Sequence, residues 1–529
     1  MAGIEAGSAP GAPGGPAAAG AGDANIGVRR EILVVLPGLL LAIMLAMLDQ
    51  LIVGTALPRI VGSLGGVAHL SWVVTAYVLA STITTPLYGK LGDMYGRKKL
   101  FMAAIVLFLA GSALAGLSQT MDQLIAFRAI QGLGAGGLMV SAIAIIGDLV
   151  SPRERGQYMG YIMGVMMVAT IGGPLLGGFI TDTFSWRWIF YINLPLGGIA
   201  LAYLATTLHL PKRRIEHRVD YPGAAILAVA TTSIVLVSTW GGTQYGWRSP
   251  QIIGLVIVAI VTVVAFVMVE GRAAEPILPL HIFRNRNFAL ISSLSFLAGL
   301  AMFGAITFLP LYQQTVQGAS PTVSGLLLTP MMVGVMVTSL IAGQLTTRTG
   351  RYRALPILGA GGMALGMFLL SLIGVHTSRV TLGLFMVVLG FGMGFLMQMT
   401  TLLAQNSVQP RDIGVASSSR LFFQQIGGSI GVSAFGAIFA SRLQHALTSV
   451  APGVHLSTGG GQFNPATVRR LPVALQHDVF YAVTHAVQGV FLWAIPAALL
   501  AFVLTWFIKE IPLRGRAPAT EEPAPELVG

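Results

Sequence analysis

The sequence of 529 residues contains no cysteine and very little charge. The absence of cysteine excludes structural disulfides, thiolate metal sites and cysteine nucleophiles. Charged residues make up only 9% of the chain, whereas an ordinary soluble domain has about 25%. A soluble protein of this size needs a charged surface, which this chain cannot supply. Since 54% of its residues are hydrophobic, the chain is suited to face lipid over much of its area.

The patterns of an enzyme or of an ATP-driven pump are also absent from the sequence. It has no phosphate-binding loop with Gly-Lys-Ser/Thr, no nucleophile elbow, and no histidine pair or carboxylate pair within its apolar segments. A membrane-embedded lipid enzyme would need such groups to converge, so it is the weaker alternative. We therefore expect a protein that is not an enzyme and that uses no cofactor and no metal.

Fourteen apolar stretches are long enough to cross a membrane, which takes roughly 20 helical residues. They lie near 33–57, 70–89, 99–118, 122–147, 156–180, 188–209, 222–240, 251–269, 288–312, 323–345, 354–375, 380–405, 421–441 and 485–508. The sequence thus predicts an all-α polytopic membrane protein embedded in a lipid bilayer.

The positive charges indicate the orientation of these spans. If both chain ends lie inside, the inner segments hold 23 of the 31 Lys and Arg residues, and the outer segments hold 7. Arg420 is counted with the inner segments. Arg128 is then the only basic residue placed within a span. This bias predicts cytoplasmic termini. It also accounts for the net charge of +12 without a nucleic-acid partner.

Two parts of the chain share a pattern that suggests an internal repeat. Gly89-x-Leu91 and Gly96-Arg97 recur 254 residues later, and five residues from Gly134 to Gly156 recur 258 residues later. We infer duplication of a six-helix unit, with two further helices inserted between the copies. The predicted organisation is a disordered tail (1–30), an N-terminal bundle (31–210), a basic linker with the two inserted helices (211–285), a C-terminal bundle (286–508) with an outer loop near 442–484, and a tail (509–529).

Three motifs make the chain resemble the major facilitator superfamily. The loop after the second span contains Gly89, Asp93, Gly96 and Arg97, and the fourth span contains the arginine motif Leu124-x-x-x-Arg128-x-x-Gln131-Gly132-x-Gly134. The fifth span carries Gly172-Gly173-Pro174-x-x-Gly177-Gly178, and the run Trp186-Arg187-Trp188-Ile189-Phe190-Tyr191-Ile192-Asn193-Leu194-Pro195 follows it. The last run is typical of the fourteen-span drug:proton antiporters (the DHA2 family).

This resemblance implies two six-helix bundles that rock about a central site, plus two inserted helices. It implies a monomer in a bacterial cytoplasmic membrane that exports drug-like lipophilic or monocationic molecules, contributes to multidrug or antibiotic resistance, and is driven by the proton gradient. The loop with Asp93 would gate the inner side, and the glycine motif around Pro174 would indicate antiport. Export of an endogenous metabolite or lipid, and nutrient symport or facilitation, are the alternatives.

Asp49 is the only carboxylate that we place well inside a span. A charge at bilayer depth costs at least ~2.5–3.5 kcal/mol, and burial favours the protonated form of a carboxyl group. Asp49 is therefore the candidate proton carrier, and the resemblance assigns the same role to the acid of this motif. Arg128 stays charged and needs a partner, so we expect it to alter the proton affinity of Asp49.

The substrate site is defined less sharply. Aromatic and amide side chains within the spans are candidates for contacts with planar or cationic molecules. These candidates are Trp72, Tyr77, Phe303, Tyr312, Gln313, Phe395 and Gln398. The second half lacks a carboxylate that matches Asp49, so we favour neutral, zwitterionic or singly charged substrates.

Overall fold

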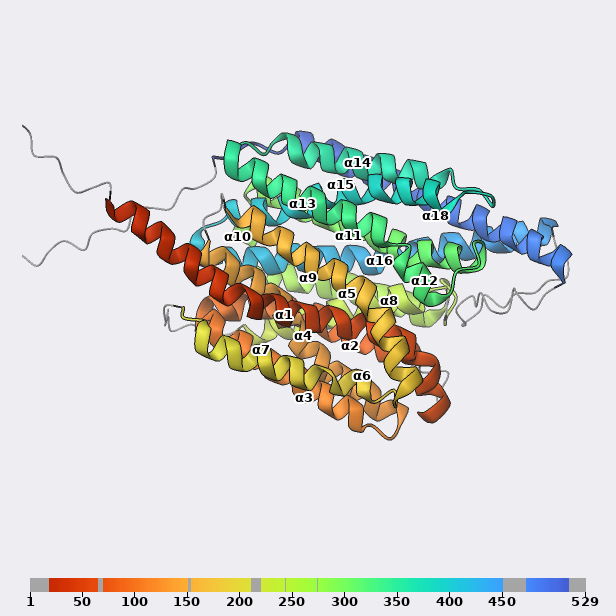
Figure 1. Cartoon of the computed structure of the whole chain (residues 1–529), viewed down its shortest axis with the longest axis horizontal. Helices are drawn as coiled ribbons and strands as arrows, with labels where there is room; N and C mark the ends of the chain where they lie inside the picture. The colour runs from red at the N-terminus through yellow and green to blue at the C-terminus, as the bar shows by residue number, and fades with distance from the viewer. Residues whose placement is uncertain are drawn as a thin grey trace, which may run out of the picture.

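The computed structural model describes residues 19–64, 70–150, 154–210, 220–242, 244–273, 275–450 and 472–512. In these residues the fold is a bundle of long, roughly parallel helices without a β-sheet (Figure 1). Thirteen of the described helices are long and apolar enough to cross a membrane. Helix α2 has comparable length but is not among these thirteen. The protein is a polytopic membrane protein, as predicted.

The first group of helices consists of α1 (Ala19–Leu64), α2 (Leu70–Tyr95), α3 (Arg97–Leu117), α4 (Met121–Leu149), α5 (Arg155–Thr183), α6 (Trp188–Tyr191) and α7 (Asn193–Thr207). Helix α4 packs against α2 and α3, and α1 packs against α5 and α7. The predicted span 188–209 is divided into α6 and α7 just before Pro195, in agreement with the preference of proline for the first turn of a helix.

The second group consists of α11 (Arg286–Thr315), α12 (Pro321–Leu326), α13 (Thr329–Thr349), α14 (Ala354–Ser371), α15 (Arg379–Asn406), the short 3₁₀ turn η2 (Pro410–Asp412), α16 (Ile413–Val450) and α18 (Val473–Trp506). Helix α16 packs against α11 and α18, while α15 packs against α13 and α14. Helices α16 and α18 run past the predicted span ends into the segment 442–484, and residues 451–471 of that segment lie outside the described residues.

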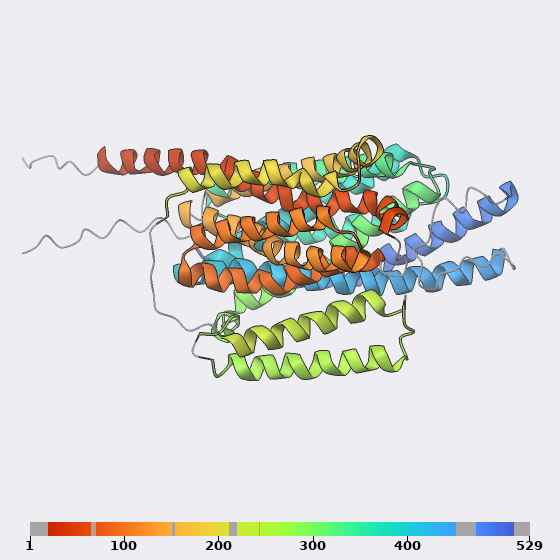
Figure 2. The ribbon, with the colours of Figure 1, turned by 90° about the horizontal axis from the view of Figure 1, so that it is seen from below.

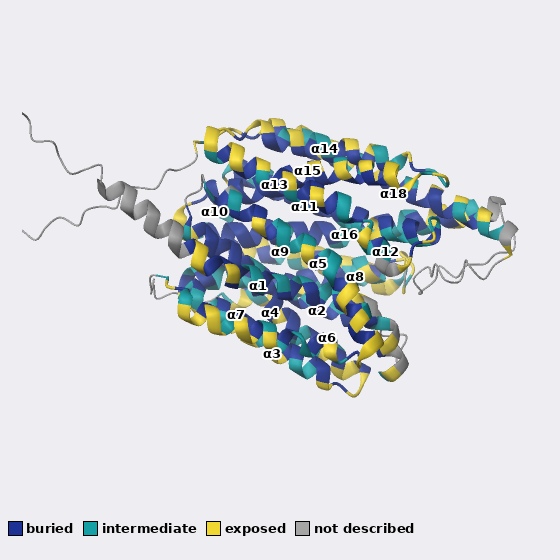
Figure 3. Cartoon of the chain, in the orientation of Figure 1, coloured by how far each residue is buried: buried dark blue, intermediate teal, exposed yellow. Residues whose placement is uncertain are grey.

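The two inserted helices, α8 (Tyr221–Trp240) and α9 (Pro250–Glu270), form a hairpin on one side of the bundle (Figure 2). Helix α8 contacts α2 and α16, and the short α10 (Leu280–Phe283) leads into α11. Exposed apolar residues lie on the outer surface, among them Ile257, Ile260 and Val261 of α9. Buried and exposed positions along each helix are distinguished by colour in Figure 3. Such an apolar exterior is expected where helices face lipid.

Two predictions about the ends of the chain can be compared with this fold. Helix α1 begins at Ala19, so the predicted disorder of 1–30 is wrong for its last residues. The helix starts after the last proline of the tail, Pro16, where good helix formers such as alanine follow. Residues 1–18, 513–529 and most of the basic linker, 211–219, lie outside the described residues.

Candidate functional site

Asp49 of α1 and Arg128 of α4 form an ion pair in the interior of the first helix group. Arg128 Nη1 lies 2.5 Å from Asp49 Oδ2, and neither side chain has any exposed surface. Arg128 also donates through Nε to the carbonyl of Val73, and its guanidinium lies 4.1 Å from the ring centre of Tyr77. The structure thus brings together the two charged residues that the sequence singled out.

Two amide side chains complete the surroundings of the carboxylate. Gln131 Nε2 and Asn193 Nδ2 donate to Asp49 Oδ1 at 2.8 and 2.9 Å, and Asn193 also contacts Ser112 Oγ at 3.0 Å. Gln131 Oε1 accepts from Arg128 Nη1 at 2.8 Å, which orients the amide. All three partners of the carboxylate are donors, an arrangement that suits an ionised aspartate.

Close packing of small residues positions these side chains. A methyl group added to Gly132 would overlap the carbonyl of Tyr77, and one added to Gly111 would lie 2.5 Å from Gln131 Cα. Helices α2, α3 and α4 therefore approach one another at backbone distance around Arg128. Tyr77 is fixed in turn, because its hydroxyl donates to the carbonyl of Ala46 at 3.2 Å.

The glycine-rich motif of α5 packs at the level of Asp49. A methyl group added to Gly173 would lie 2.6 Å from Leu51 Cβ, and one added to Gly172 would lie 3.9 Å from Leu48. Pro174 faces Gly325 of α12 in the second helix group. Gly177 is buried and its carbonyl accepts from Thr181, while Gly178 is only partly buried and has open space beside its Cα.

The signature loop (89–97) ties the two helix groups together at one end of the bundle. We call this end, which carries Lys90, Arg97 and Lys98, the basic end; it lies on the left in Figure 1. Asp93 accepts from the backbone N–H groups of Gly414 and Val415 at 3.2 and 3.0 Å, at the start of α16.

Asp93 also forms an ion pair with Arg97 Nη2 at 2.7 Å. It lies in the last turn of α2, beyond the apolar part of the helix, where burial raises its pKa to about 6 although Arg97 and the backbone donors oppose this shift. Gly96 has a φ of 95°, which favours glycine at the turn into α3. In the second copy of the motif, Thr347 donates to Gly343 on its own helix, so this position lacks the carboxylate that joins the groups at Asp93.

Further contacts close the basic end. Arg155 Nη1 donates to Gln405 Oε1 at 3.1 Å, from α5 to α15, and a methyl group added to Gly89 would overlap Ser418 of α16. Gly160 of α5 packs against Leu340 of α13 in the same manner. In this conformation the two helix groups are therefore in contact at the basic end.

The predicted substrate residues are spread over several surroundings. The rings of Trp72 and of Trp240 in the inserted helices pack edge to face, with their centres 5.5 Å apart. Tyr77 belongs to the Asp49 site. Phe303 packs beside Gly428 of α16, and Phe395 is buried against Phe391 at 4.8 Å.

The remaining three candidates are buried. The Tyr312 hydroxyl donates to the carbonyl of Gly374 at 2.7 Å, and Gln398 lies on the buried part of α15. Gln313 is completely buried, and neither polar atom of its amide has a hydrogen-bond partner in the structure as described. The seven candidates thus do not form one pocket in this conformation.

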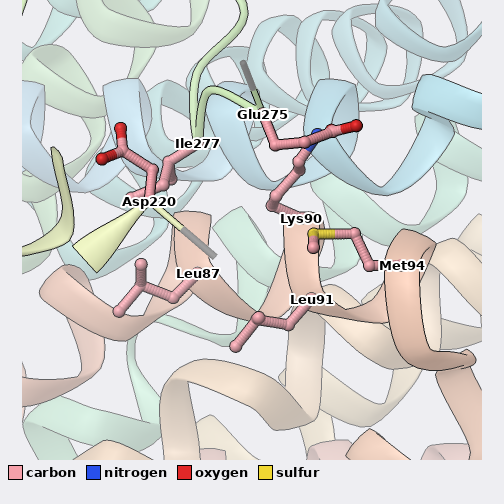
Figure 4. A pocket seen from close by; sticks show the side chains of 7 residues that line it. All are labelled: Leu87, Lys90, Leu91, Met94, Asp220, Glu275 and Ile277. Carbon is pink, nitrogen blue, oxygen red and sulfur yellow. The ribbon is translucent and has the colours of Figure 1, made fainter. Parts of the chain in front are cut away.

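A small pocket at the basic end contains none of these seven residues (Figure 4). It lies between α2 and the segments that flank the inserted hairpin, and it is lined by Leu87, Lys90, Leu91, Met94, Asp220, Glu275 and Ile277. Lys90 Nζ lies 2.6 Å from Glu275 Oε2, so the signature loop is also tied to the inserted segment. No group of three or more His, Asp or Glu side chains in the described part of the chain is placed to hold a metal ion.

Sequence reasoning missed the roles of Asn193 and Ser112 and misplaced Arg420. Asn193 lies in the run 186–195, which is typical of the antiporter family. Nothing in that run indicates that the Asn193 amide contacts Asp49. Arg420 was assigned to an inner segment, whereas it lies buried within α16. The statement that Arg128 is the only basic residue within a span is therefore wrong. The predicted start of that span, residue 421, was too late because Ser417, Ser418 and Ser419 lower the local hydropathy.

Comparison with known proteins identifies the family. The profile of the Major Facilitator Superfamily matches residues 39–232 and 223–432. Multidrug resistance protein 3 of Bacillus subtilis is 38% identical over 92% of this chain and 96% of its own length. The multidrug transporter protein MdtP of the same organism is 39% identical over 79% of this chain and 77% of its own. An uncharacterised MFS-type transporter of Mycobacterium tuberculosis is 41% identical over 92% of this chain and 70% of its own length.

Solved structures show the same fold. The human organic anion transporter MFSD10 superposes with a TM-score of 0.59 at 16% identity, over 90% of this chain and 99% of its own. The proton:xylose symporter XylE superposes with a TM-score of 0.58 at 15% identity, over 91% of this chain and 96% of its own. This chain belongs to the major facilitator superfamily and is a membrane transporter, not an enzyme.

Proposed function

We propose that this transporter exports drug-like lipophilic or monocationic small molecules in exchange for protons. The observation that carries the proposal is the fully buried Asp49 carboxylate, which is held by three donors from Arg128, Gln131 and Asn193. The sequence identity of 39% and 38% to two multidrug transporters, over most of the chain, supports this class of substrate. The natural compound is an exogenous drug or an endogenous metabolite of the same character.

The donors around Asp49 provide a reason for coupling. They stabilise the ionised carboxylate in this conformation, so protonation has to break or weaken the pair with Arg128. A guanidinium left buried without its partner is strongly destabilised, by about 3–5 kcal/mol in typical proteins. A proton on Asp49 therefore favours a rearrangement of α1 against α4, and the α5 motif packed against Leu48 and Leu51 transmits this change to the second group of helices.

The distribution of positive charges supports the proposed orientation. With the basic end in the cytoplasm, the contacts of Asp93 and Arg155 close the cytoplasmic side in the conformation described here. We place the protein in a bacterial cytoplasmic membrane with both termini inside. It acts as a monomer without a cofactor, and the proton gradient is its energy source. One proton crossing 100 mV releases about 2.3 kcal/mol, which sustains roughly fifty-fold accumulation.

The test uses purified protein in liposomes with an imposed pH gradient and ethidium as the substrate. We expect gradient-driven ethidium transport by the wild type and none by Asp49→Asn. Asp182→Asn is the matched control, because Asp182 is an exposed carboxylate that pairs with Arg59 at the surface. Equal gradient-driven transport by wild type and Asp49→Asn would assign the proton route to another group. If wild type moves no ethidium with the gradient, the proposed antiport of such compounds is wrong.

A further inference from the structure

Arg420 is a buried cation like Arg97, Arg128 and Arg155, but the described residues provide no carboxylate partner for it. Its side chain is 4% exposed, and no Asp or Glu among the described residues lies within 4 Å of its guanidinium. Arg420 Nε donates to Thr400 Oγ1 on α15 at 3.3 Å, a long distance for a charged donor. Arg128, in contrast, has a carboxylate, an amide and a carbonyl around it.

The position of Arg420 is central in the transporter. It follows Val415 by five residues on α16, which corresponds to about 7.5 Å along a helix, so it lies just behind the contact that closes the basic end. Ser417, one turn earlier, accepts from Gln405, and Gln405 accepts from Arg155 of the first helix group. Arg420 thus belongs to a polar layer where α15 and α16 meet the other half.

No charged neighbour among the described residues interacts with Arg420 in this layer, whereas Asp148 interacts electrostatically with Arg155. The hydroxyl groups of Ser417, Ser418 and Ser419 donate to carbonyl groups one turn earlier on α16. Arg155, the other buried cation here, donates to the carbonyls of Val150 and Gly147 and to Gln405. A guanidinium that stays charged and buried is costly unless an anion neutralises it.

We propose that Arg420 is a specificity-determining residue that binds the carboxylate of acidic or zwitterionic substrates. The guanidinium matches a carboxylate in shape and donates two parallel hydrogen bonds to it. When the basic end opens, Arg420 is among the first charged groups behind the closure that a substrate meets. The inference deepens the proposed export function, because it adds organic acids with an apolar body to the lipophilic and cationic compounds.

The test measures binding in detergent without a pH gradient, so it does not depend on proton coupling. The probes are rhodamine 110, which carries a free aromatic carboxyl group, and rhodamine 123, which is its methyl ester. We expect Arg420→Gln to weaken binding of the free acid by about tenfold or more and to leave the ester unchanged. Arg420→Lys keeps the charge but loses the bidentate geometry, so an intermediate loss is expected.

Arg411→Gln is the matched control, because Arg411 is an exposed arginine in η2, just before α16, with a side chain that is 70% exposed. It should change binding of neither probe. An equal effect of Arg420→Gln on both probes, no effect on either, or no binding of the free acid by the wild type would overturn the proposal. Failure of the export proposal would appear differently, as Arg420-dependent binding of the acid without gradient-driven transport by the wild type.

Discussion

Gly89 offers a quantitative test of how the basic end closes. A methyl group at this position would overlap the Ser418 side chain and lie 2.7 Å from the backbone carbonyl of Gly414, which cannot move without shifting α16. Both contacts join α2 to α16 and exist only while the two halves touch at the basic end. Gly89→Ala should therefore destabilise this conformation selectively and leave the packing within each half unchanged.

The size of the effect follows from the overlap. Overpacking of a tight contact costs about 1–3 kcal/mol, and a bias of this size shifts a two-state equilibrium roughly 5- to 150-fold. Gly92→Ala is the matched control on the same helix, because its methyl group would lie 3.6 Å from Arg97 Cγ, an ordinary contact. We expect Gly92→Ala to leave the equilibrium nearly unchanged. The pair of variants separates loss of the close approach from a general effect of alanine in α2.

The assay uses the absence of cysteine from the chain. Cysteines introduced at the exposed positions Lys99 and Arg353, one in each half, allow spin labels to report the distance across the basic end. Gly89→Ala should move the distance distribution towards the longer separation, and adding Ser418→Gly should reverse part of this shift. A distribution identical to that of the unsubstituted pair would refute the conclusion that this contact closes the basic end.

Three further predictions concern pH and coupling. Because burial raises the pKa of Asp93 from 3.8 to about 6, closure of the basic end gains stability as pH falls through about 6 and loses it as pH rises. The same spin labels should show about tenfold more closure at pH 5 than at pH 7, and Asp93→Asn should remove this dependence. Asn193→Ala removes one donor from the Asp49 carboxylate, a loss of about 1.5–3 kcal/mol, so gradient-driven ethidium transport should fall below that of wild type; an unchanged transport rate contradicts the assigned contact. Gly173→Val should separate α5 from α1 at Leu51 and let protons leak without substrate, measurable as decay of a pH gradient in liposomes; a proton leak equal to that of wild type contradicts this role.

Much of the architecture could be predicted because it depends on local sequence. The length of the apolar stretches was enough to predict a helix at each span, and the position of Asp49 and Arg128 inside such stretches marked them as unusual charges. Breaks inside spans depend on single prolines whose effect varies with context. The division before Pro195 and the one between α12 and α13 were therefore not predicted.

The rest depends on contacts between distant segments. Asn193 lies 144 residues from Asp49 in the sequence, and no local pattern states that α7 places an amide beside α1. Arg420 was assigned to a loop because polar serines precede it, although packing against α15 buries the whole stretch. Aromatic side chains gave the least information about the substrate site. The same residue types pack helices together and contact ligands, so the sequence does not separate the two roles.

The most direct test of the central claim is a measurement of proton release on substrate binding. Purified protein in weakly buffered detergent solution is mixed with ethidium while a pH indicator records the protons released. If substrate and proton exchange through Asp49, wild type releases protons on ethidium binding, Asp49→Asn releases none, and Asp182→Asn releases as many as wild type. Binding of ethidium by wild type without proton release at any pH, or equal release by Asp49→Asn, would contradict exchange of substrate and proton through Asp49.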